Sequence, residues 1–490
     1  MSEVRRLRIW LSVLVLIILG TGGCATVKRA RAVQRGEDAV AGEHTVSAAQ
    51  LGLTTNMVLD LEHALAIALE YHPMIAVARQ QVIVASNQTK QVFSSFLPTI
   101  GAAGSYSTFT ADNRSLPSSH GWQALGGLVK AARDAGEITP KAVQTWATEV
   151  GKPGESHSFE QYSAGINADL LIYDFGRTPA ALRRAVAYQA AMDEQLRLAC
   201  NEVAYNVRAS FFKLANAQAL LQVAEESERQ YRTHLEQVQA FFDVGRRIRY
   251  DVTKAEVDVR NAELSVINAR NALKNARAAL NRSLGLAEDP PYTIEGASLT
   301  LDAHDLESFS LLARDRHPEL GMLRAREQMA SALVDLAIAD LYPEFRLQAG
   351  YAGKDARLPI LFNWSAALQG AINLFSGGRR LARIDEMVAE LRSARAQVAS
   401  REQQLYSDLN QACHLLEGAE QRLHVTGLLV KTATESLDLI EERYRVGSAS
   451  SIEVTDAQVA LTKARAEEVQ AKYDREAAVA AIRYTIGDEW

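Results

Sequence analysis

Cysteine, proline and glycine are scarce in this chain. Only 3 Cys, 11 Pro and 29 Gly occur among its 490 residues. Three cysteines cannot form the disulfide framework of a small secreted domain. The scarcity of helix-breaking residues leaves long stretches rich in Ala, Leu, Arg, Glu and Gln, which favour long helices over a compact mixed fold. The two cysteines beyond residue 24, Cys200 and Cys413, are expected to be small core residues on helix seams.

The sequence also lacks the motifs and charge blocks of several function classes. The 10 histidines are scattered, and no HExxH, Gly-rich phosphate loop or CxxC occurs. We therefore expect no enzyme, no metal site and no cofactor. The net charge of -6 is mild, and basic and acidic residues are interspersed, so nothing indicates a nucleic-acid surface and we expect no nucleic-acid partner.

The N-terminus has the pattern of an export signal. Three arginines among the first eight residues precede an apolar run that is too short to span a bilayer. Small residues then lead directly to Cys24, as they do where bacterial lipoproteins are acylated. We predict a signal peptide over 1–23 and a lipid-anchored segment over 24–56. Thr21 stands where the acylation pattern usually has Leu, so an ordinary signal peptide cleaved nearby is the alternative.

The chain contains an internal repeat. His72-Pro73 recurs as His317-Pro318, 245 residues later, and Pro98 recurs as Pro343 at the same offset. Four further markers recur at an offset of 202: Arg177 with Arg379, Gly245 with Gly447, Asp251-Val252 with Glu453-Val454, and Gly285 with Gly487. Self-similarity of this kind indicates a tandem duplication. We predict two repeats, 57–287 and 302–490, with a linker over 288–301.

Each repeat has the same predicted order of elements: a helical run that ends at a proline, a pair of strands, a long helix, a Gly-centred turn and a final helix. The first runs cover 59–96 and 306–341. Residues 178–244 contain no glycine and, after Pro179, no proline, which allows one helix about 100 Å long. Its apolar residues are spaced by three and four, as in coiled coils: Met192, Leu196, Cys200, Val203, Val207, Phe211 and Leu214. We expect a barrel of helices with strand pairs at one end.

The predicted strands alternate between apolar and polar residues. In the first repeat the apolar positions are Tyr162, Ala164, Ile166, Ala168, Leu170 and Ile172, and in the second they are Trp364, Ala366, Leu368, Gly370, Ile372 and Leu374. Such alternation is typical of a lipid-embedded barrel around water, although a soluble sandwich also alternates. Hairpins on helices this long have no soluble core to cover. Because four strands cannot close a barrel, several protomers must share one. Residues 107–160, which the second repeat lacks, are expected to form an outer loop.

These features together resemble the TolC-like outer-membrane efflux protein family, and its lipidated branch in particular. The resemblance covers residues 59–487, and its markers are repeated in order and in register: Leu97-Pro98, Tyr173-Asp174-Phe175-Gly176-Arg177, Phe375-Ser376-Gly377-Gly378-Arg379 and Tyr444-Arg445-Val446-Gly447. It implies a mostly α fold with a small transmembrane β part. In this fold a homotrimer forms a periplasmic α-helical barrel, a coiled-coil tunnel, topped by a shared barrel of twelve strands, four from each protomer.

The function that the resemblance implies is that of an exit duct in a tripartite efflux or type I secretion system. The duct is lipid-anchored in the bacterial outer membrane and passes substrates from a periplasmic adaptor and an inner-membrane pump to the exterior. The implied adaptor-docking tips are the helix–turn–helix ends around Val244-Gly245 and Val446-Gly447. Glycine suits a left-handed turn that reverses a helix. Plain turns without a docking role are the alternative.

A tunnel constriction is implied at Glu453 and Asp456, which share one helix face because they are three residues apart. Threefold symmetry would collect these carboxylates in a cation-attracting ring. Acidic residues near a helix start are otherwise ordinary surface charges that complement the helix dipole.

A latch that closes the tunnel is implied at Tyr444 and Asp251. The family pattern has an arginine after the second tip glycine, whereas this chain has Ala449. Either the latch is weaker here, or a nearby arginine supplies the charge: Arg246, Arg247 or Arg249.

Two other interpretations stay open at the level of sequence. A periplasmic adaptor would also combine an export signal, a lipid anchor and a helical hairpin. Adaptors carry one hairpin flanked by β-rich domains, whereas this chain has duplicated hairpins. A structural lipoprotein with coiled-coil hairpins that does not conduct is the second alternative.

Overall fold

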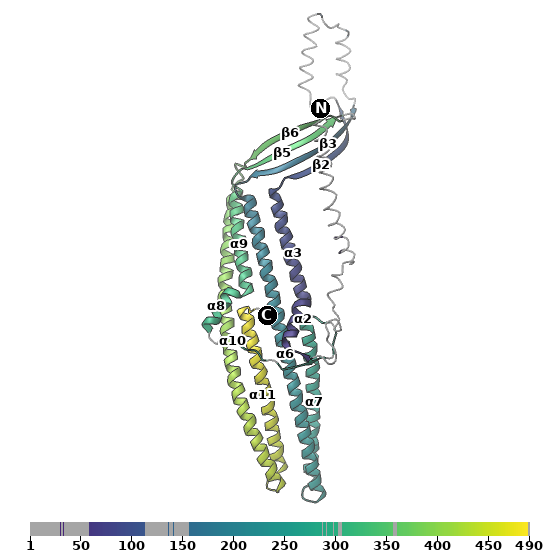
Figure 1. Cartoon of the computed structure of the whole chain (residues 1–490), viewed down its shortest axis with the longest axis vertical. Helices are drawn as coiled ribbons and strands as arrows, with labels where there is room; N and C mark the ends of the chain where they lie inside the picture. Colours follow the sequence, from purple (N-terminus) through teal and green to yellow (C-terminus); the bar gives the residue numbers. More distant parts are fainter. Residues whose placement is uncertain are drawn as a thin grey trace. The chain divides into compact units, whose positions relative to one another are not determined.

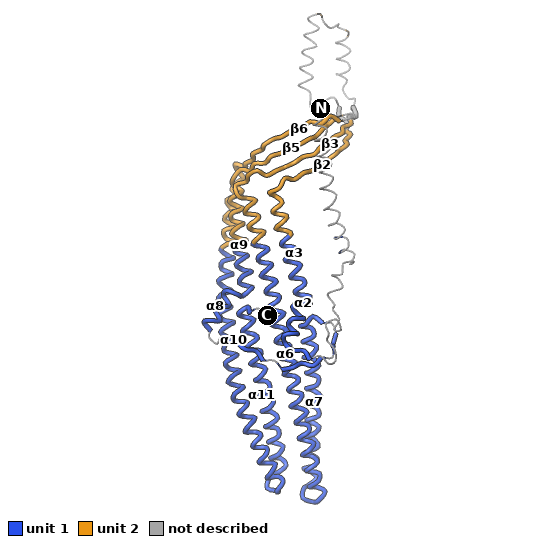
Figure 2. Tube along the Cα trace, in the orientation of Figure 1, with its two compact units in different colours: residues 1–86, 187–328, 392–490 blue, residues 87–186, 329–391 orange. Residues whose placement is uncertain are grey.

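The computed structural model describes residues 58–112, 156–286, 288–290, 292–296, 298–301, 306–355 and 360–488, with the single positions 30, 33, 136 and 141. The chain is mostly helical with a small antiparallel sheet, which confirms the predicted fold class (Figure 1). The chain divides into two compact units (Figure 2). One comprises 1–86, 187–328 and 392–490, and the other comprises 87–186 and 329–391.

The first helical run of each repeat is broken at its His-Pro pair, so the expectation of unbroken runs was wrong. The structure has α2 (Leu61–Tyr71), α3 (Pro73–Phe93) and the 3-10 turn η2 (Ser94–Phe96), and later α8 (Leu306–Arg316) and α9 (Pro318–Ala339). Proline has no N–H to donate and disfavours helical backbone in the residue before it. His72 is accordingly extended, with ψ 127°.

The long helices follow the predicted pattern closely. They are α6 (Arg177–Asp243) and α10 (Arg379–Arg445), each of 67 residues, which pair with α7 (Arg249–Ser283) and α11 (Ser451–Ile486). All four end in a left-handed glycine: Gly245, Gly285, Gly447 and Gly487. In each case the glycine N–H and the next N–H bond back to carbonyls of the last turn, as in a Schellman motif. The glycines therefore determine where each helix stops.

The main core lies in the first unit, around α2, α6, α7 and α11. Its largest fully buried side chains include Phe211, Phe212, Leu280 and Tyr292. The short strands β1 (Val58–Leu59) and β4 (Thr293–Ile294) pair in parallel beside it. Cys200 is buried in this core and Cys413 packs against it, half-buried, as expected for structural cysteines.

Gly487 closes α11 against the break between α8 and α9. A Cβ at this position would lie 2.9 Å from the Cα of His317 and 3.1 Å from Cδ of Pro318. Gly245 has almost the same backbone angle, φ +75° against +74°, but a Cβ there would meet nothing within 4 Å. Substitution at Gly245 therefore measures backbone strain alone, and substitution at Gly487 measures the same strain together with steric overlap.

Gly487→Ala is expected to lower the free energy of unfolding by about 3 kcal/mol, since left-handed strain and overpacking add. Gly245→Ala should cost only about 1 kcal/mol, from strain alone. Both changes in the free energy of unfolding can be measured by unfolding the detergent-solubilised variants and monitoring their circular dichroism. Equal losses in the two variants would show that the contact with the His317-Pro318 break contributes nothing.

The sheet of the second unit has the order β2-β3-β5-β6 and is antiparallel throughout. Its strands are β2 (Thr99–Asp112), β3 (Ser156–Tyr173), β5 (Glu344–Asp355) and β6 (Phe362–Ala371). The register aligns Ala102, Ile166, Tyr351 and Trp364 in one row and Gly101, Asn167, Gly350 and Ser365 in the next. Apolar and polar rows thus alternate as predicted. None of the helices in the described ranges is long and apolar enough to cross a membrane.

Two strand boundaries differ from the prediction. Residues 107–112 and 156–160 belong to β2 and β3, so the segment expected to be a loop is shorter than 107–160. The alternating pattern continues into this segment and was overlooked. At the other end, β6 stops at Ala371, so Ile372 and Leu374 lie outside the strand. Gly377 and Gly378, both with positive φ, then lead into α10.

Candidate functional site at the helix tips

The two long hairpins turn at short loops that expose apolar side chains. The first turn joins α6 to α7 over 244–248, and the second joins α10 to α11 over 446–450. Val244 is 68% exposed and Val446 is 80% exposed. Both valines thus lie beside a left-handed glycine that reverses the chain, and an exposed apolar side chain at each tip is suited to contact with another protein.

A small apolar cluster joins the two tips beneath these turns. Its buried members are Val238, Val252, Ala255, Tyr444, Ala449 and Val454. They come from α6, α7, α10, α11 and the second turn. Because both hairpins contribute, the tips of one chain are held together by packing.

Arg247 of the first turn contacts the second tip directly. Its guanidinium carbon lies 4.6 Å from the centre of the Tyr444 ring, and its Nη2 donates a hydrogen bond to the Ala449 carbonyl oxygen at 3.1 Å. Tyr444 is only 2% exposed. Burial raises the pKa of its phenol, which nearby Arg247 opposes and Asp251 reinforces. Of the three arginines considered from sequence, Arg247 is therefore the one in contact with Tyr444.

Asp251 acts on Tyr444 through its charge. In the described part of the chain no hydrogen bond joins the two side chains, and Asp251 lies in the first turn of α7. The two predicted latch residues, Tyr444 and Asp251, thus lie near each other, but the residue in direct contact with Tyr444 is Arg247.

His234 is a further tip residue that sequence reasoning missed. It is 3% exposed, its Nε2 lies 3.1 Å from Oγ of Ser451, and its ring centre is 5.4 Å from that of Tyr444. Burial lowers its pKa to about 4, against the opposing charge of Asp258. His234 is therefore neutral at neutral pH. Its partner is 217 residues away, so no local signal could have revealed the pair.

Glu453 and Asp456 have different surroundings. Glu453 forms a capping box with Ser450: its Oε1 accepts from the Ser450 N–H at 3.0 Å, and its own N–H donates to Ser450 Oγ at 3.3 Å. These hydrogen bonds, the backbone one foremost, lower the pKa of Glu453. Arg443 lies 3.7 Å from its other oxygen. The sequence Ser450-Ser451-Ile452-Glu453 is a recognisable capping-box motif that had been overlooked.

Asp456 is exposed and has neither an ion pair nor a hydrogen bond with its side chain among the described residues. Its charge is therefore exposed to solvent, whereas the Glu453 carboxylate is hydrogen-bonded to the N-cap residue of α11. No group of three or more His, Cys, Asp or Glu in the described ranges could hold a metal ion. Cys24 lies outside the described residues.

Comparison with known proteins places the chain in a class. The family model for outer membrane efflux proteins matches residues 64–286 and 310–488. The alkaline protease secretion protein AprF of Pseudomonas aeruginosa is 22% identical over 352 residues, covering 70% of this chain and 73% of AprF. The cation efflux system protein CusC of Escherichia coli O157:H7 is 23% identical over 351 residues, covering 69% of this chain and 75% of CusC. A crystal structure of CusC gives a TM-score of 0.74 at 18% identity, covering 89% of this chain and 94% of that one.

The fold is that of the TolC-like outer-membrane channels. With most of its length matched, the chain belongs to the outer membrane efflux protein family. It is an outer-membrane efflux or secretion channel and not an enzyme. The adaptor alternative finds no support in these comparisons.

Proposed function

We propose that this chain is one of three identical protomers of a lipid-anchored exit duct that completes a tripartite efflux or type I secretion system. The sheet supports a shared barrel, because β2 and β6 are its edges and each lacks a second partner strand within the described chain. Unpaired edges cannot persist in lipid. Trp364 on β6 lies in one row with Tyr351 and Ile166, and an apolar row of this kind suits the lipid-facing side of a barrel.

The tips are the proposed docking surface for the periplasmic adaptor of an inner-membrane pump. Val244-Gly245 and Val446-Gly447 support this role because each pair combines an exposed apolar side chain with a turn that needs glycine. The observation that carries the proposal is the exposure of both valines above a cluster that fixes the two turns together.

The same tips form the proposed gate of the duct. Glu453 and Asp456, repeated in three protomers, make the constriction, and Tyr444 with Asp251 makes the latch. Arg247 contacts both Tyr444 and the Ala449 carbonyl oxygen, beside the position where the family pattern has an arginine. This contact favours the second of the two sequence alternatives, a latch whose charge comes from the first tip.

Cys24 is the proposed site of lipid attachment after removal of residues 1–23. The charged and apolar segments that lead to small residues and Cys24 support it. The mass of the mature N-terminus tests the assignment, and a protein that starts elsewhere without acyl chains would refute it.

The docking role is tested with Val446→Asp in the full-length protein, coexpressed with the periplasmic adaptor of the same bacterium. A charge on the exposed tip should abolish copurification of the adaptor, since docking would bury the carboxylate. Val425→Asp is the matched control, because Val425 is an exposed valine within α10, away from the turn. Both variants are compared as intact trimers. Undiminished copurification with Val446→Asp would rule out docking at this tip.

A further inference from the structure

An arginine-rich pocket lies where the strands of the second unit meet its helices. The pocket has a volume of about 580 Å³. Its charged lining residues are Arg177, Arg379, Arg380, Arg383, Asp340 and Glu344. Four guanidinium groups thus face two carboxylates. Neither the tips nor the tunnel constriction includes any of these residues.

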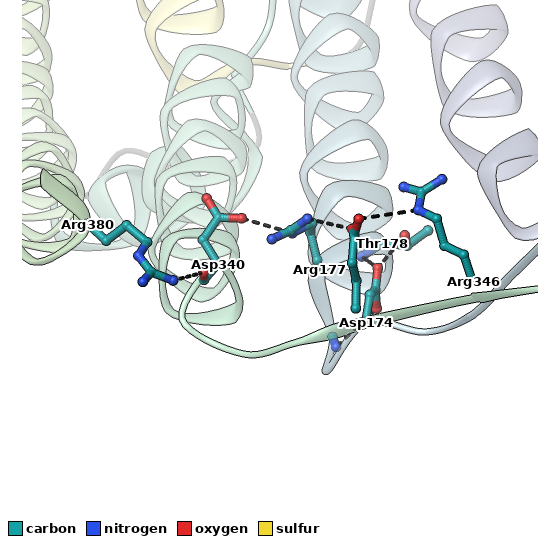
Figure 3. A network of polar contacts seen from close by, with 8 residues as sticks. Asp174, Arg177, Thr178, Asp340, Arg346 and Arg380 are labelled. Carbon is teal, nitrogen blue, oxygen red and sulfur yellow. Dashed lines mark hydrogen bonds and ion pairs between the residues drawn. The ribbon is translucent and has the colours of Figure 1, made fainter. Parts of the chain in front are cut away.

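The two carboxylates in the pocket, Asp340 and Glu344, both form ion pairs with Arg177. Asp340 Oδ1 lies 2.8 Å from Nε of Arg177, and Glu344 Oε2 lies 3.0 Å from Nη1 of the same arginine. Glu344 also pairs with Arg346, at 3.3 Å. Figure 3 shows Asp340 between Arg177 and Arg380. Little negative charge therefore remains for the other arginines.

Arg379 and Arg380 have no carboxylate partner among the described residues. Arg380 bonds instead to three neutral acceptors: the carbonyl oxygens of Asp340, at 3.0 Å, and of Asn373, and the hydroxyl of Ser376, at 3.4 Å. The Arg379 side chain makes no hydrogen bond or ion pair in the described ranges, and it is exposed. Arg383 pairs with Glu386 at 3.0 Å. Two guanidinium charges at this pocket are thus uncompensated.

The internal repeat supplies a comparison. At the start of α6, Asp174 accepts hydrogen bonds from the backbone N–H of Gly176, at 3.2 Å, and of Thr178, at 2.6 Å. The position 202 residues later is Ser376, and Thr178 corresponds to Arg380. The start of α6 therefore carries its own anion, whereas the start of α10 has a neutral serine and additional arginines. A helix start with guanidinium groups around it attracts an anion from outside the chain.

The wall of the pocket is apolar and aromatic. Tyr342, Ala371 and Ile372 line it, and the Tyr342 ring stacks on Phe175 with centroids 5.3 Å apart. Phe175 also meets Tyr173, at 4.7 Å. Leu374 and Phe375, just beyond β6, are strongly exposed. Aromatic rings beside cationic groups are typical of the boundary between a membrane and water.

From the uncompensated arginines and this wall, we infer that the pocket binds the phosphate of an anionic phospholipid, with the acyl chains against the apolar side. A phosphodiester offers oxygens that match the planar donors of arginine. Arg379 and Arg380 are the residues that contact it. The inference rests on the proposed function in one respect, that the strands of this unit lie in the membrane.

Native mass spectrometry of the full-length protein in detergent tests this inference. The protein is titrated with phosphatidylglycerol, with phosphatidylcholine and with inorganic phosphate. We expect phosphatidylglycerol to bind once per protomer and more tightly than the other two. Arg379→Gln should weaken it about fivefold, and the Arg379→Gln/Arg380→Gln double variant about 25-fold. Arg379→Gln is the decisive variant because the substitution breaks no hydrogen bond or ion pair within the described residues.

Arg392→Gln is the matched control, since Arg392 is another exposed arginine of α10 that has no carboxylate partner in the described ranges. It should leave lipid binding unchanged. Equal lipid binding by Arg379→Gln and the unchanged protein would overturn the inference, as would phosphate that binds as tightly as the lipid. Loss of trimers in Arg379→Gln would also overturn it and assign the pocket to a contact between protomers. Failure of the unchanged protein to form trimers and conduct would instead count against the proposed function.

Discussion

Arg247→Ala is expected to raise the resting conductance of the channel reconstituted in planar bilayers. The substitution removes the stacking of the guanidinium group on Tyr444 and its hydrogen bond to the Ala449 carbonyl oxygen. Together these contacts stabilise the joined tips by about 2 kcal/mol. Since the joined tips are the proposed closed state, loss of that stabilisation should shift the ratio of open to closed channels about 30-fold towards open.

Two further variants make this prediction specific. Arg246→Ala is the matched control, because the neighbouring Arg246 is exposed and its side chain has no hydrogen bond or ion pair in the described ranges. Its resting conductance should equal that of the unchanged protein. Arg247→Lys retains the charge but loses the planar group, so an intermediate conductance is expected. If Arg247→Ala conducts no more than Arg246→Ala, the contact does not act as a latch.

Loss of cation selectivity is the second large expected effect, in the double variant Glu453→Gln/Asp456→Asn. Three copies of each carboxylate at one constriction would create a strong negative potential that concentrates cations. Neutral amides in their place should lower the ratio of cation to anion permeability several-fold and relieve block by multivalent cations. Reversal potentials in asymmetric salt measure the ratio.

The capping box determines which substitution to use at Glu453. Its Oε1 accepts the Ser450 N–H at 3.0 Å, so alanine would remove a helix cap together with the charge. Glutamine keeps an oxygen acceptor and isolates the electrostatic effect. Asp456→Asn alone serves as the comparison, because the Asp456 side chain has no hydrogen bond among the residues that the structure describes. A cation preference that survives in the double variant, with trimers intact, would mean that these residues are ordinary surface charges.

Most of the fold could be predicted because its signals are local. The 67-residue helices follow from a lack of breakers, and their ends follow from glycines that adopt positive φ. The errors were also local. The breaks at His72 and His317 come from the proline that follows each of them, and the extra length of β2 and β3 continues an alternation already present.

The candidate site was less predictable, because its contacts join residues far apart in sequence. Three arginines near the first tip were equivalent in sequence, and only the packing of the tips brings Arg247, and not Arg246 or Arg249, against Tyr444. His234 and Ser451 meet across 217 residues. Residue types and their spacing in the sequence cannot predict which of several side chains will be in contact. Those contacts depend on how the two helices are rotated about their axes.

The sequence by itself determined the long helices, the alternating strands and the tip glycines. Each depends on backbone preference or on the period of one element, and these act over a few residues. Only the tertiary structure decided that the four strands form one sheet in the order β2-β3-β5-β6, and that arginines from α6 and α10 line one pocket. Sheet order and side-chain neighbours depend on packing between distant segments, where the same local pattern is compatible with many arrangements.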